Sequence, residues 1–357
     1  MFLGVAVVAI WLFLLLGRRG FWRMAVDAPP AASGPPPRIV AVIPARNEAD
    51  VVARAIASLA KQHYAGEFHI VLVDDHSDDG TAEAARAAAG PDLLTVIHAE
   101  PLPPGWTGKL WAVAAGVRYA GRYDPEYFLL TDADITHPVN AVSCLAARAG
   151  GGYDLVSYMA TLHCASLAER ALVPAFVFFF FLLYPPAAGT GAAGGCMLVR
   201  RSALERAGGI ERIRGALIDD CSLAAAIRAS GGRVWLGLSP ETRSIRPYRG
   251  FGEIGRMISR SAFTQLRYSF WLLLGTVFGL LLTYVAPVGL ALSGSLWGIA
   301  AWAMMIVAFA PALRFYRVSL LWAPLLPLIA IFYLGATVHS ALSHWRGRGG
   351  LWKGRTF

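Results

Sequence analysis

The longest uncharged stretch of the chain, residues 269–313, determines its class because it contains no Asp, Glu, Lys, Arg or His. A helix needs about 20 apolar residues to cross a bilayer, and this stretch is roughly twice as long. Ser293-Gly294-Ser295 marks a turn inside it, so we predict a hairpin of two transmembrane helices. Residues 318–340 form a further apolar segment, which its prolines weaken. The sequence therefore predicts two or three transmembrane helices over residues 269–340.

The N-terminal apolar segment, residues 1–17, stands before Arg18, Arg19 and Arg23. A cleaved secretory signal carries its positive charge on the other side of the apolar region. We therefore predict an uncleaved membrane anchor, with the following domain in the cytosol, because positively charged flanks favour the cytosolic side. A basic, proline-rich linker, residues 18–37, connects the anchor to that domain.

The basic tail, residues 341–357, leaves the number of C-terminal crossings open. Three crossings would place this tail outside the cytosol, against the preference of positive residues for the cytosolic side. A re-entrant segment around Pro324 and Pro327 would return the tail to the cytosol. With either topology, the sequence predicts a multi-pass protein of the inner, cytoplasmic membrane.

The net charge of +9 is explained by the membrane rather than by nucleic acid. Many Arg and Lys residues flank apolar segments, and no basic run with interleaved aromatic residues resembles a nucleic-acid-binding module. We therefore expect the lipid bilayer, and no nucleic acid, as a partner. The four cysteines show no metal-ligand spacing, which is typical of reduced thiols facing a cytosolic milieu.

Between the apolar ends, residues 38–268 have the pattern of an α/β domain. Helices and buried strands alternate, with strands predicted at residues 39–43, 68–73, 93–98 and 127–130 and helices at residues 49–60, 81–89 and 110–120. Such alternation predicts a mostly parallel, Rossmann-like sheet. Ligands of parallel sheets bind at the carboxyl ends of the strands, so we expect the functional site there.

Acidic residues follow three of these strands. Asp132 and Asp134 come directly after the strand at 127–130, and positions i and i+2 of an extended chain point the same way. Two carboxylates that converge in this way suit Mg²⁺ or Mn²⁺, which prefer oxygen ligands. The remaining polar residues at these strand ends are Asn47, Glu48, Asp74 and Asp75.

Each of these acids also has a simpler explanation. Residues 74–81 can be an Asx-rich turn that caps a helix, and Glu48 can be a first-turn acid that favours the helix dipole. Asp132 and Asp134 can lie in a solvated turn. Three strand ends that all carry acids are harder to explain by capping alone.

The apolar segment at residues 171–184 is too short to cross a bilayer and too hydrophobic for a protein surface. It is either a buried core helix or a segment that lies in the membrane interface. The sequence leaves both interpretations open.

Several motifs within residues 38–268 resemble, in their order and spacing, the family 2 glycosyltransferases of the GT-A fold. These motifs are Ile43-Pro44-Ala45-Arg46-Asn47-Glu48, the turn at 74–81, Gly105-Trp106-Thr107-Gly108-Lys109, Thr131-Asp132-Ala133-Asp134, residues 194–201 and residues 217–223. Within that family, the N-terminal anchor and residues 102–109 and 262–269 resemble the hopanoid-biosynthesis-associated membrane glycosyltransferases.

The resemblance implies a role for each matching residue. Those expected to bind the nucleotide sugar are Pro44, Asn47, Glu48, Asp74, Asp75, Lys109 and Asp132. Asp134, together with Asp132, would hold Mg²⁺ or Mn²⁺. Asp220 would be the catalytic base, with Asp219 beside it. The alternative for this acidic pair is an N-cap of the helix predicted at residues 222–230.

The last family motif departs from the usual pattern. Many family 2 enzymes carry Gln-x-x-Arg-Trp before their membrane helices, where this chain has Arg260, Gln265 and Arg267-Tyr268 at a different spacing. These residues can contact diphosphate and acceptor, or they can belong to a basic belt beside the membrane. The departure argues against a processive polysaccharide synthase.

The resemblance thus implies an inverting, metal-dependent glycosyltransferase that moves a sugar from a nucleotide sugar, such as a UDP-sugar, to a membrane lipid. A hopanoid is the acceptor that the narrower resemblance implies. The alternatives are a polyprenyl phosphate or a diacylglycerol as acceptor, and a non-catalytic membrane scaffold that retains the fold. The sequence does not identify the donor sugar.

Overall fold

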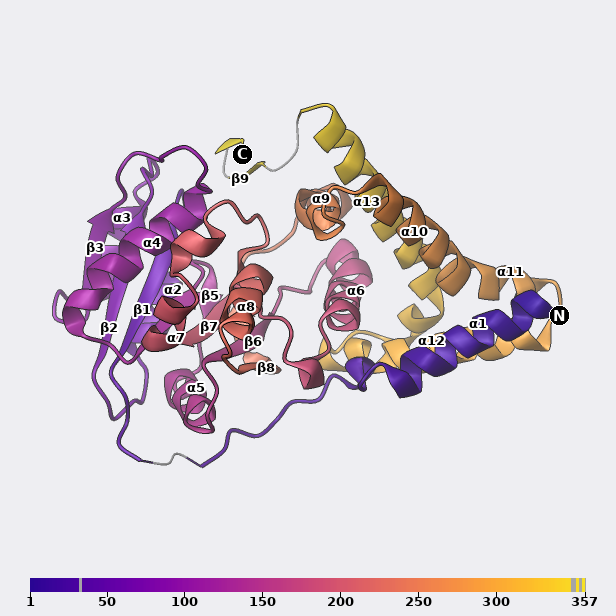
Figure 1. Cartoon of the computed structure of the whole chain (residues 1–357), viewed down its shortest axis with the longest axis horizontal. Helices are drawn as coiled ribbons and strands as arrows, with labels where there is room; N and C mark the ends of the chain where they lie inside the picture. Colours follow the sequence, from indigo (N-terminus) through magenta and orange to yellow (C-terminus); the bar gives the residue numbers. More distant parts are fainter. Residues whose placement is uncertain (32–33, 348–350, 353–354, 357) are drawn as a thin grey trace.

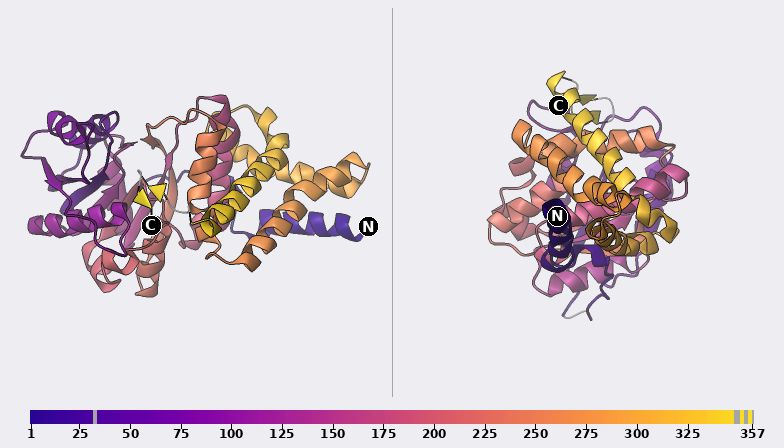
Figure 2. Two further views of the ribbon diagram at one scale, coloured as in Figure 1. Left: turned by 90° about the horizontal axis from the view of Figure 1, so that it is seen from above. Right: turned by 90° about the vertical axis from the view of Figure 1, so that its right-hand side faces the viewer.

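The computed structural model describes residues 1–31, 34–347, 351–352 and 355–356. An α/β domain occupies one end of the molecule and a bundle of apolar helices occupies the other, with the N-terminus at the far tip of the bundle (Figures 1 and 2). The remaining residues of the predicted basic tail, 348–350, 353–354 and 357, lie outside the described residues.

Eight strands form one mixed sheet in the order β3-β2-β1-β4-β7-β6-β8-β5. Their bounds are β1 (Ile39–Ala45), β2 (Phe68–Asp74), β3 (Leu94–His98), β4 (Tyr127–Thr131), β5 (Ile135–Thr136), β6 (Leu155–Thr161), β7 (Cys196–Arg200) and β8 (Val234–Ser244). The four strands predicted from sequence are all present, and they pair in parallel. Strand β7 runs antiparallel to both β4 and β6, so the other half of the sheet is mixed. The predicted α/β fold class is confirmed.

Helices cover both faces of this sheet. Their bounds are α2 (Val52–Ala60), α3 (Thr81–Ala88), α4 (Gly108–Ala120), α5 (Ala141–Gly150), α7 (Arg201–Arg206) and α8 (Asp219–Ala229), with short helical turns η3 (Gly121–Tyr123) and η5 (Ile210–Ile213). Side chains of β1 alternate between the faces, so Val40 and Val42 pack with α4 and α8. Ile39 and Ile43 pack with α2 and α5 on the opposite face. A sheet buried on both faces explains the continuous apolar runs of its strands.

Within the described residues, four helical segments are long and apolar enough to cross a membrane. Three of them follow the α/β domain, and the predicted hairpin is formed by α10 (Phe270–Leu280), η6 (Leu281–Val285), α11 (Ala286–Leu292) and α12 (Leu296–Phe315). The N-terminal helix, α1 (Phe2–Leu12) with η1 (Phe13–Gly17), packs along α12. The Trp11 indole donates to the Thr283 carbonyl over 2.8 Å, which ties this helix to η6.

The last apolar segment, η7 (Leu320–Leu325) followed by α13 (Leu326–Trp345), turns back toward the α/β domain. The Trp302 indole donates to the Pro324 carbonyl over 3.1 Å, so η7 reaches the middle of α12 rather than its far end. Helix α13 then runs alongside α9 (Phe251–Gln265), where the Ser259 hydroxyl donates to the Ala336 carbonyl over 3.0 Å. By length and composition, Leu320–Trp345 can cross a membrane, and the re-entrant alternative stays a prediction.

Helix α6 (Leu167–Leu183) and the following turn η4 (Pro186–Ala188) correct one prediction. The helix begins earlier than residue 171 because Ser166 and Glu169 form a capping box, and Leu167–Ala188 is long enough to cross a membrane. The prediction that this segment is too short was therefore wrong. Half of its most apolar 18-residue stretch is buried inside the protein. Helices α6 and α9 lie between the sheet and the outer helices (Figures 1 and 2).

Candidate active site

The candidate site lies at the carboxyl ends of β1, β2 and β4. The strand register aligns Ala45 with Asp74, and the Asp75 amide donates to the Ala45 carbonyl over 2.8 Å. Asp132 follows Thr131, the last residue of β4. The expectation that these strand ends share one edge is therefore met by the parallel pairing.

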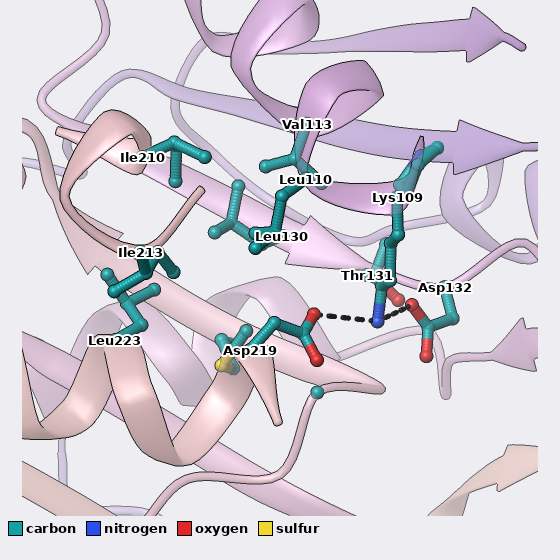
Figure 3. A pocket seen from close by; sticks show the side chains of 13 residues that line it. Lys109, Leu110, Val113, Leu130, Thr131, Asp132, Ile210, Ile213, Asp219 and Leu223 are labelled. Atoms are coloured by element: carbon teal, nitrogen blue, oxygen red, sulfur yellow. Dashed lines mark ion pairs between the residues drawn. The ribbon is translucent and has the colours of Figure 1, made fainter. Parts of the chain in front are cut away.

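Lys109 is the central cation of this edge. Its Nζ lies 2.8 Å from Asp132 Oδ1 and 3.0 Å from Asp219 Oδ2 (Figure 3). The Thr107 hydroxyl caps α4 by accepting from the Leu110 amide, which places Lys109 in the first turn of that helix. Burial acts to lower the pKa of Lys109, but the two carboxylates outweigh it and raise that pKa. The ammonium is therefore held charged between two acids that are far apart in sequence.

Burial also raises the pKa of Asp132, and the charge of Lys109 opposes that rise. The side chains of Lys109, Asp132 and Asp219 are 23%, 34% and 19% exposed, so the ion pairs remain within reach of solvent and of a ligand.

Asp220 lies beside this cluster and is held by two backbone donors. Its Oδ2 accepts from the Gly194 amide over 2.9 Å, and its Oδ1 accepts from the Cys221 amide over 2.7 Å. Burial raises the pKa of Asp220 to about 6, with a further contribution from the negative charge of Asp219. Each carboxylate oxygen has two lone pairs, so both retain a position that can take a proton.

The N-cap interpretation of the acidic pair is wrong. Helix α8 begins at Asp219, and Ile218 is the residue at its N-cap. Both acids therefore lie in the first turn, where negative charge is favoured by the helix dipole. Asp219 uses its carboxylate for Lys109 instead of capping its own helix.

A small cavity of about 320 Å³, including the part open to solvent, adjoins these polar groups. One side is lined by Lys109, Thr131, Asp132 and Asp219, whereas the rest is apolar and includes Leu130 (Figure 3). Pro44, one of the residues expected near the donor, also lines it.

Asp134 points to a different set of partners from Asp132. Its Oδ2 accepts from the Ser244 hydroxyl over 3.0 Å and lies 3.4 Å from Arg246 Nε. Arg246 also forms an ion pair with Glu48. Strand β4 ends at Thr131, so the alternation expected of an extended chain does not extend to Asp134. That geometric argument for convergence of the two carboxylates was therefore wrong.

The chemistry of this edge still suits a hard divalent cation. Asp132 and Asp134 supply carboxylate oxygen, which Mg²⁺ and Mn²⁺ prefer, and such ions usually share their coordination with phosphate and water. Among the described residues, no group of three or more His, Cys, Asp or Glu side chains is arranged to hold a metal. The residues therefore fit a cation that is shared with a diphosphate, rather than one enclosed by protein ligands alone.

The polar turn after β2 is joined to the loop after β1 by hydrogen bonds between backbone amides and side-chain oxygens. Asn47 has a left-handed backbone, with φ of 51°, and its side-chain oxygen accepts from the Asp78 amide over 3.1 Å. The Glu48 amide donates to the Thr81 hydroxyl over 2.8 Å. The two loops therefore form one hydrogen-bonded unit.

Asp74 and Asp75 are both buried, which is rare for acidic side chains in a soluble domain. Asp74 Oδ2 lies 3.2 Å from His98 Nδ1, and Asp75 Oδ2 lies 3.7 Å from Arg46 Nη1. Neither acid simply caps a helix in solvent, because Thr81 begins α3 and Gly80 stands at its N-cap.

The residues expected near diphosphate and acceptor are only partly gathered. Gln265 exchanges hydrogen bonds with the Tyr184 hydroxyl, with its Nε2 at 2.7 Å and its Oε1 at 3.0 Å. Arg260 and Arg267 are exposed, and neither forms an ion pair with a carboxylate in the described part of the chain. The phosphate-contact and basic-belt interpretations of these two arginines both stay predictions.

Two contributors to the site were missed from the sequence. Arg246 lies 198 residues from Glu48, and no motif indicated their pairing. Gly194 contributes only its amide, but an added Cβ there would lie 3.4 Å from Asp220 Oδ2 and 3.5 Å from Lys109 Nζ. Its place in the motif at residues 194–201 was the available signal for this close approach.

Comparison with known proteins agrees with this geometry. Residues 40–208 match the family described as glycosyl transferase family 2. An N-acetylglucosaminyltransferase of Rhizobium leguminosarum bv. viciae is 33% identical over 134 residues, which are 35% of this chain and 29% of that protein. The chain thus matches less than a third of the length of this curated relative.

A solved structure shows the same fold. The mannosyltransferase PcManGT from Pyrobaculum calidifontis, solved with GDP-Man and Mn²⁺, matches with a TM-score of 0.55 at 21% identity. The match covers 95% of this chain and 97% of that chain, so it includes the apolar helices as well as the GT-A-like sheet. Glucosyl-3-phosphoglycerate synthase from Mycobacterium tuberculosis, with Mg²⁺ and uridine diphosphate, gives a TM-score of 0.43 at 18% identity over 65% of this chain and 79% of that one.

The mixed α/β sheet, the order of the motifs along it and the family match agree with one another. Residues 40–208 of this chain are a glycosyltransferase family 2 domain on a GT-A-like fold.

Proposed function

We propose that the protein is an inverting glycosyltransferase that moves a sugar from a nucleotide sugar to a lipid of the membrane in which its apolar helices lie. The observation that carries this proposal is the cluster of Lys109, Asp132 and Asp219 beside Asp220, at the strand edge of a family 2 domain. Lys109 supplies a cation that can bind phosphate, and Asp220 supplies a separate carboxylate whose pKa is raised by burial.

The donor would occupy the edge formed by the loops after β1, β2 and β4. Asn47, Asp74 and Asp75 are proposed to border the nucleoside, and Pro44 and Glu48 the adjoining part of the donor. Lys109 is positioned to offset the negative charge that builds on the departing diphosphate. A ligand that brings phosphate to Lys109 would compete with Asp132 and Asp219 for its ammonium.

Asp132 and Asp134 are proposed to hold Mg²⁺ or Mn²⁺ together with the diphosphate. When bound there, the cation would act as a Lewis acid that stabilises the leaving group. The PcManGT structure contains GDP-Man and Mn²⁺, and that pairing motivates the proposal for this chain. Arg246, 3.4 Å from Asp134 Oδ2, would orient that carboxylate toward the ligand.

Asp220 is proposed to be the general base. The acceptor hydroxyl transfers its proton to an Asp220 oxygen while its own oxygen bonds to the anomeric carbon, and the bond from that carbon to the diphosphate breaks. A single displacement of this kind inverts the anomeric configuration. With a pKa of about 6, Asp220 is ionised in most molecules at neutral pH and is more basic than an ordinary Asp.

The membrane side of the molecule supports a lipid acceptor. Tyr184, near the end of α6, is hydrogen bonded to Gln265 of α9, and these helices lie between the catalytic domain and the outer helices (Figure 1). We further propose that η7 is re-entrant, which places the tail and the catalytic domain on one side, the cytosolic one by the positive charge of their flanks.

The test is transfer of radiolabelled sugar by the purified full-length protein in liposomes. Panels of nucleotide sugars and of lipids, including a hopanoid, a polyprenyl phosphate and a diacylglycerol, would identify donor and acceptor. We expect transfer into extractable lipid, loss of transfer with EDTA, and recovery with Mn²⁺ or Mg²⁺. Binding of a nucleotide sugar without any turnover would instead support a non-catalytic scaffold.

A further inference from the structure

A second cavity lies where the N-terminal anchor meets the catalytic domain. It measures about 970 Å³, including the part open to solvent, and it does not share lining residues with the cavity at Lys109. Arg18 and Arg19, which directly follow η1, line it together with Arg228 from the last turn of α8. Tyr184 and Thr190 supply hydroxyl groups to the same wall.

The three arginines differ in the hydrogen bonds that they make with backbone carbonyls. Arg18 donates from Nε and Nη2 to the Leu182 carbonyl, over 3.1 and 2.8 Å, so it caps the end of α6. Arg19 makes one longer contact, 3.3 Å from Nη1 to the Ala187 carbonyl. Arg228 is exposed. Within the ranges that the structure describes, none of the three forms an ion pair with a carboxylate.

Three guanidinium groups without carboxylate partners leave this cavity strongly positive. A guanidinium presents several N–H donors in a fixed planar fork, which matches the oxygens of a phosphate. The Thr190 hydroxyl adds a donor that a phosphate oxygen can accept from, whereas the Tyr184 hydroxyl already donates to Gln265 Oε1. The lining is therefore complementary to a phosphate group.

The surroundings of the cavity identify where that phosphate comes from. Phe13 and Leu183, which line it, are 61% and 51% exposed, and they belong to helices long or apolar enough to lie in a membrane. Figure 1 shows the inner end of α1 at the junction between the bundle and the α/β domain. This is the level at which lipid headgroups would meet the protein, with acyl chains against the exposed apolar residues.

We propose that this cavity binds the phosphate of an anionic membrane lipid, at a site separate from the nucleotide-sugar site. Arg228 and Arg19 contact the phosphate, whereas Arg18 holds the anchor against α6. The bound lipid links the anchor to α8, whose first turn carries Asp220. The inference rests on insertion of the apolar helices in a bilayer, and it does not require that sugar transfer occurs.

The test is a binding titration of the full-length protein in detergent micelles with tail-labelled phosphatidic acid. Diacylglycerol with the same label is the phosphate-free comparison, and inorganic phosphate is the competitor. We expect phosphatidic acid to bind at least tenfold more tightly than diacylglycerol. Arg228→Gln and Arg19→Gln should each weaken phosphatidic acid binding about tenfold, as expected for loss of one charge-assisted hydrogen-bonded contact.

Arg170→Gln is the matched control, because Arg170 is an exposed arginine near the opposite end of α6 and does not line the cavity. It should bind phosphatidic acid as the unaltered protein does, and the melting temperatures of all variants should agree. The proposal is overturned if diacylglycerol binds equally well, or if Arg170→Gln weakens binding as much as Arg228→Gln. Displacement of the lipid by millimolar inorganic phosphate would also overturn it, in favour of a soluble phosphate as ligand.

Discussion

Replacing Asp219 with Asn tests how the site sets the basicity of Asp220. Asp219 adds a negative charge next to Asp220, and that charge contributes to raising the Asp220 pKa to about 6. It also neutralises Lys109, whose Nζ is 3.0 Å from Asp219 Oδ2. Removing the Asp219 charge ends the repulsion and leaves more of the Lys109 charge to act on Asp220. Both effects lower the pKa of Asp220, so that pKa should fall in the Asp219→Asn protein.

The size of the shift follows from Coulomb's law. Two unit charges roughly 6 Å apart interact by about 1.4 kcal/mol at an effective dielectric constant of about 40, between the values for water and for a protein surface. That energy corresponds to about one pKa unit. The acid limb of kcat/KM should therefore move from about pH 6 in the unaltered protein to about pH 5 in Asp219→Asn.

The assay is the initial rate of sugar transfer into lipid at low donor concentration, measured from about pH 4.5 to about pH 8.5. In the unaltered protein the rate should fall as pH drops through about 6, because the base becomes protonated. Asp220→Asn should lower the rate about 10²- to 10⁴-fold across this range. Its melting temperature must be measured too, since Asn offers one acceptor oxygen where Asp220 serves the Gly194 and Cys221 amides.

Two results would refute the reasoning. An acid limb that stays in place or moves to higher pH in Asp219→Asn would show that Asp219 does not act on the group that titrates. An Asp220→Asn protein that keeps both the rate and the acid limb would show that Asp220 is not the base.

Three further changes test other parts of the structure. Lys109→Met should reduce kcat/KM for the donor about 10- to 100-fold, while Lys109→Arg should restore part of it, as measured by initial rates. Arg246→Ala should lower the free energy of unfolding by about 1 to 2 kcal/mol, seen in denaturant titration, because Glu48 and Asp134 lose their shared cation. Gly116→Ala should lower the free energy of unfolding by about 1 to 3 kcal/mol, because its Cβ would lie 2.8 Å from a Val73 methyl group. Gly121→Ala, which has open space around it, should leave that free energy nearly unchanged, and thermal melts of both variants measure the difference.

The fold was predictable from the sequence where local signals are strong. Apolar runs of strand length, separated by helical periods, identified β1 to β4 within one or two residues and implied their parallel pairing. Strands β6, β7 and β8 were not predicted, since their antiparallel and mixed pairing depends on contacts between distant segments. The start of α6 was missed because Glu169 reads as a surface charge, although it is buried in the capping box.

The site was predictable for residues that carry a motif and not for those defined by tertiary contact alone. Lys109, Asp132 and Asp219 come from different motifs, and the fold places the Lys109 ammonium within 3.0 Å of both carboxylates. The separate pairing of Asp134 did not follow, because Arg246 reaches it from the end of β8, more than a hundred residues away in sequence. A local pattern indicates which side chains can do chemistry, whereas the partners of each side chain depend on the packing of the whole sheet.

Helix α8 connects the two proposed sites, yet their tests are independent. Asp220 and Arg228 lie at opposite ends of this helix, about 12 Å apart at a rise of 1.5 Å per residue. Across that distance in water, two unit charges interact by about 0.3 kcal/mol before screening, and the Debye length of about 8 Å reduces this further. Arg228→Gln should therefore move the acid limb by less than about 0.3 pH units while it weakens lipid binding about tenfold. A larger movement of the limb would mean that the lipid phosphate acts on Asp220 directly, and the two cavities would then have to be treated as one acceptor site.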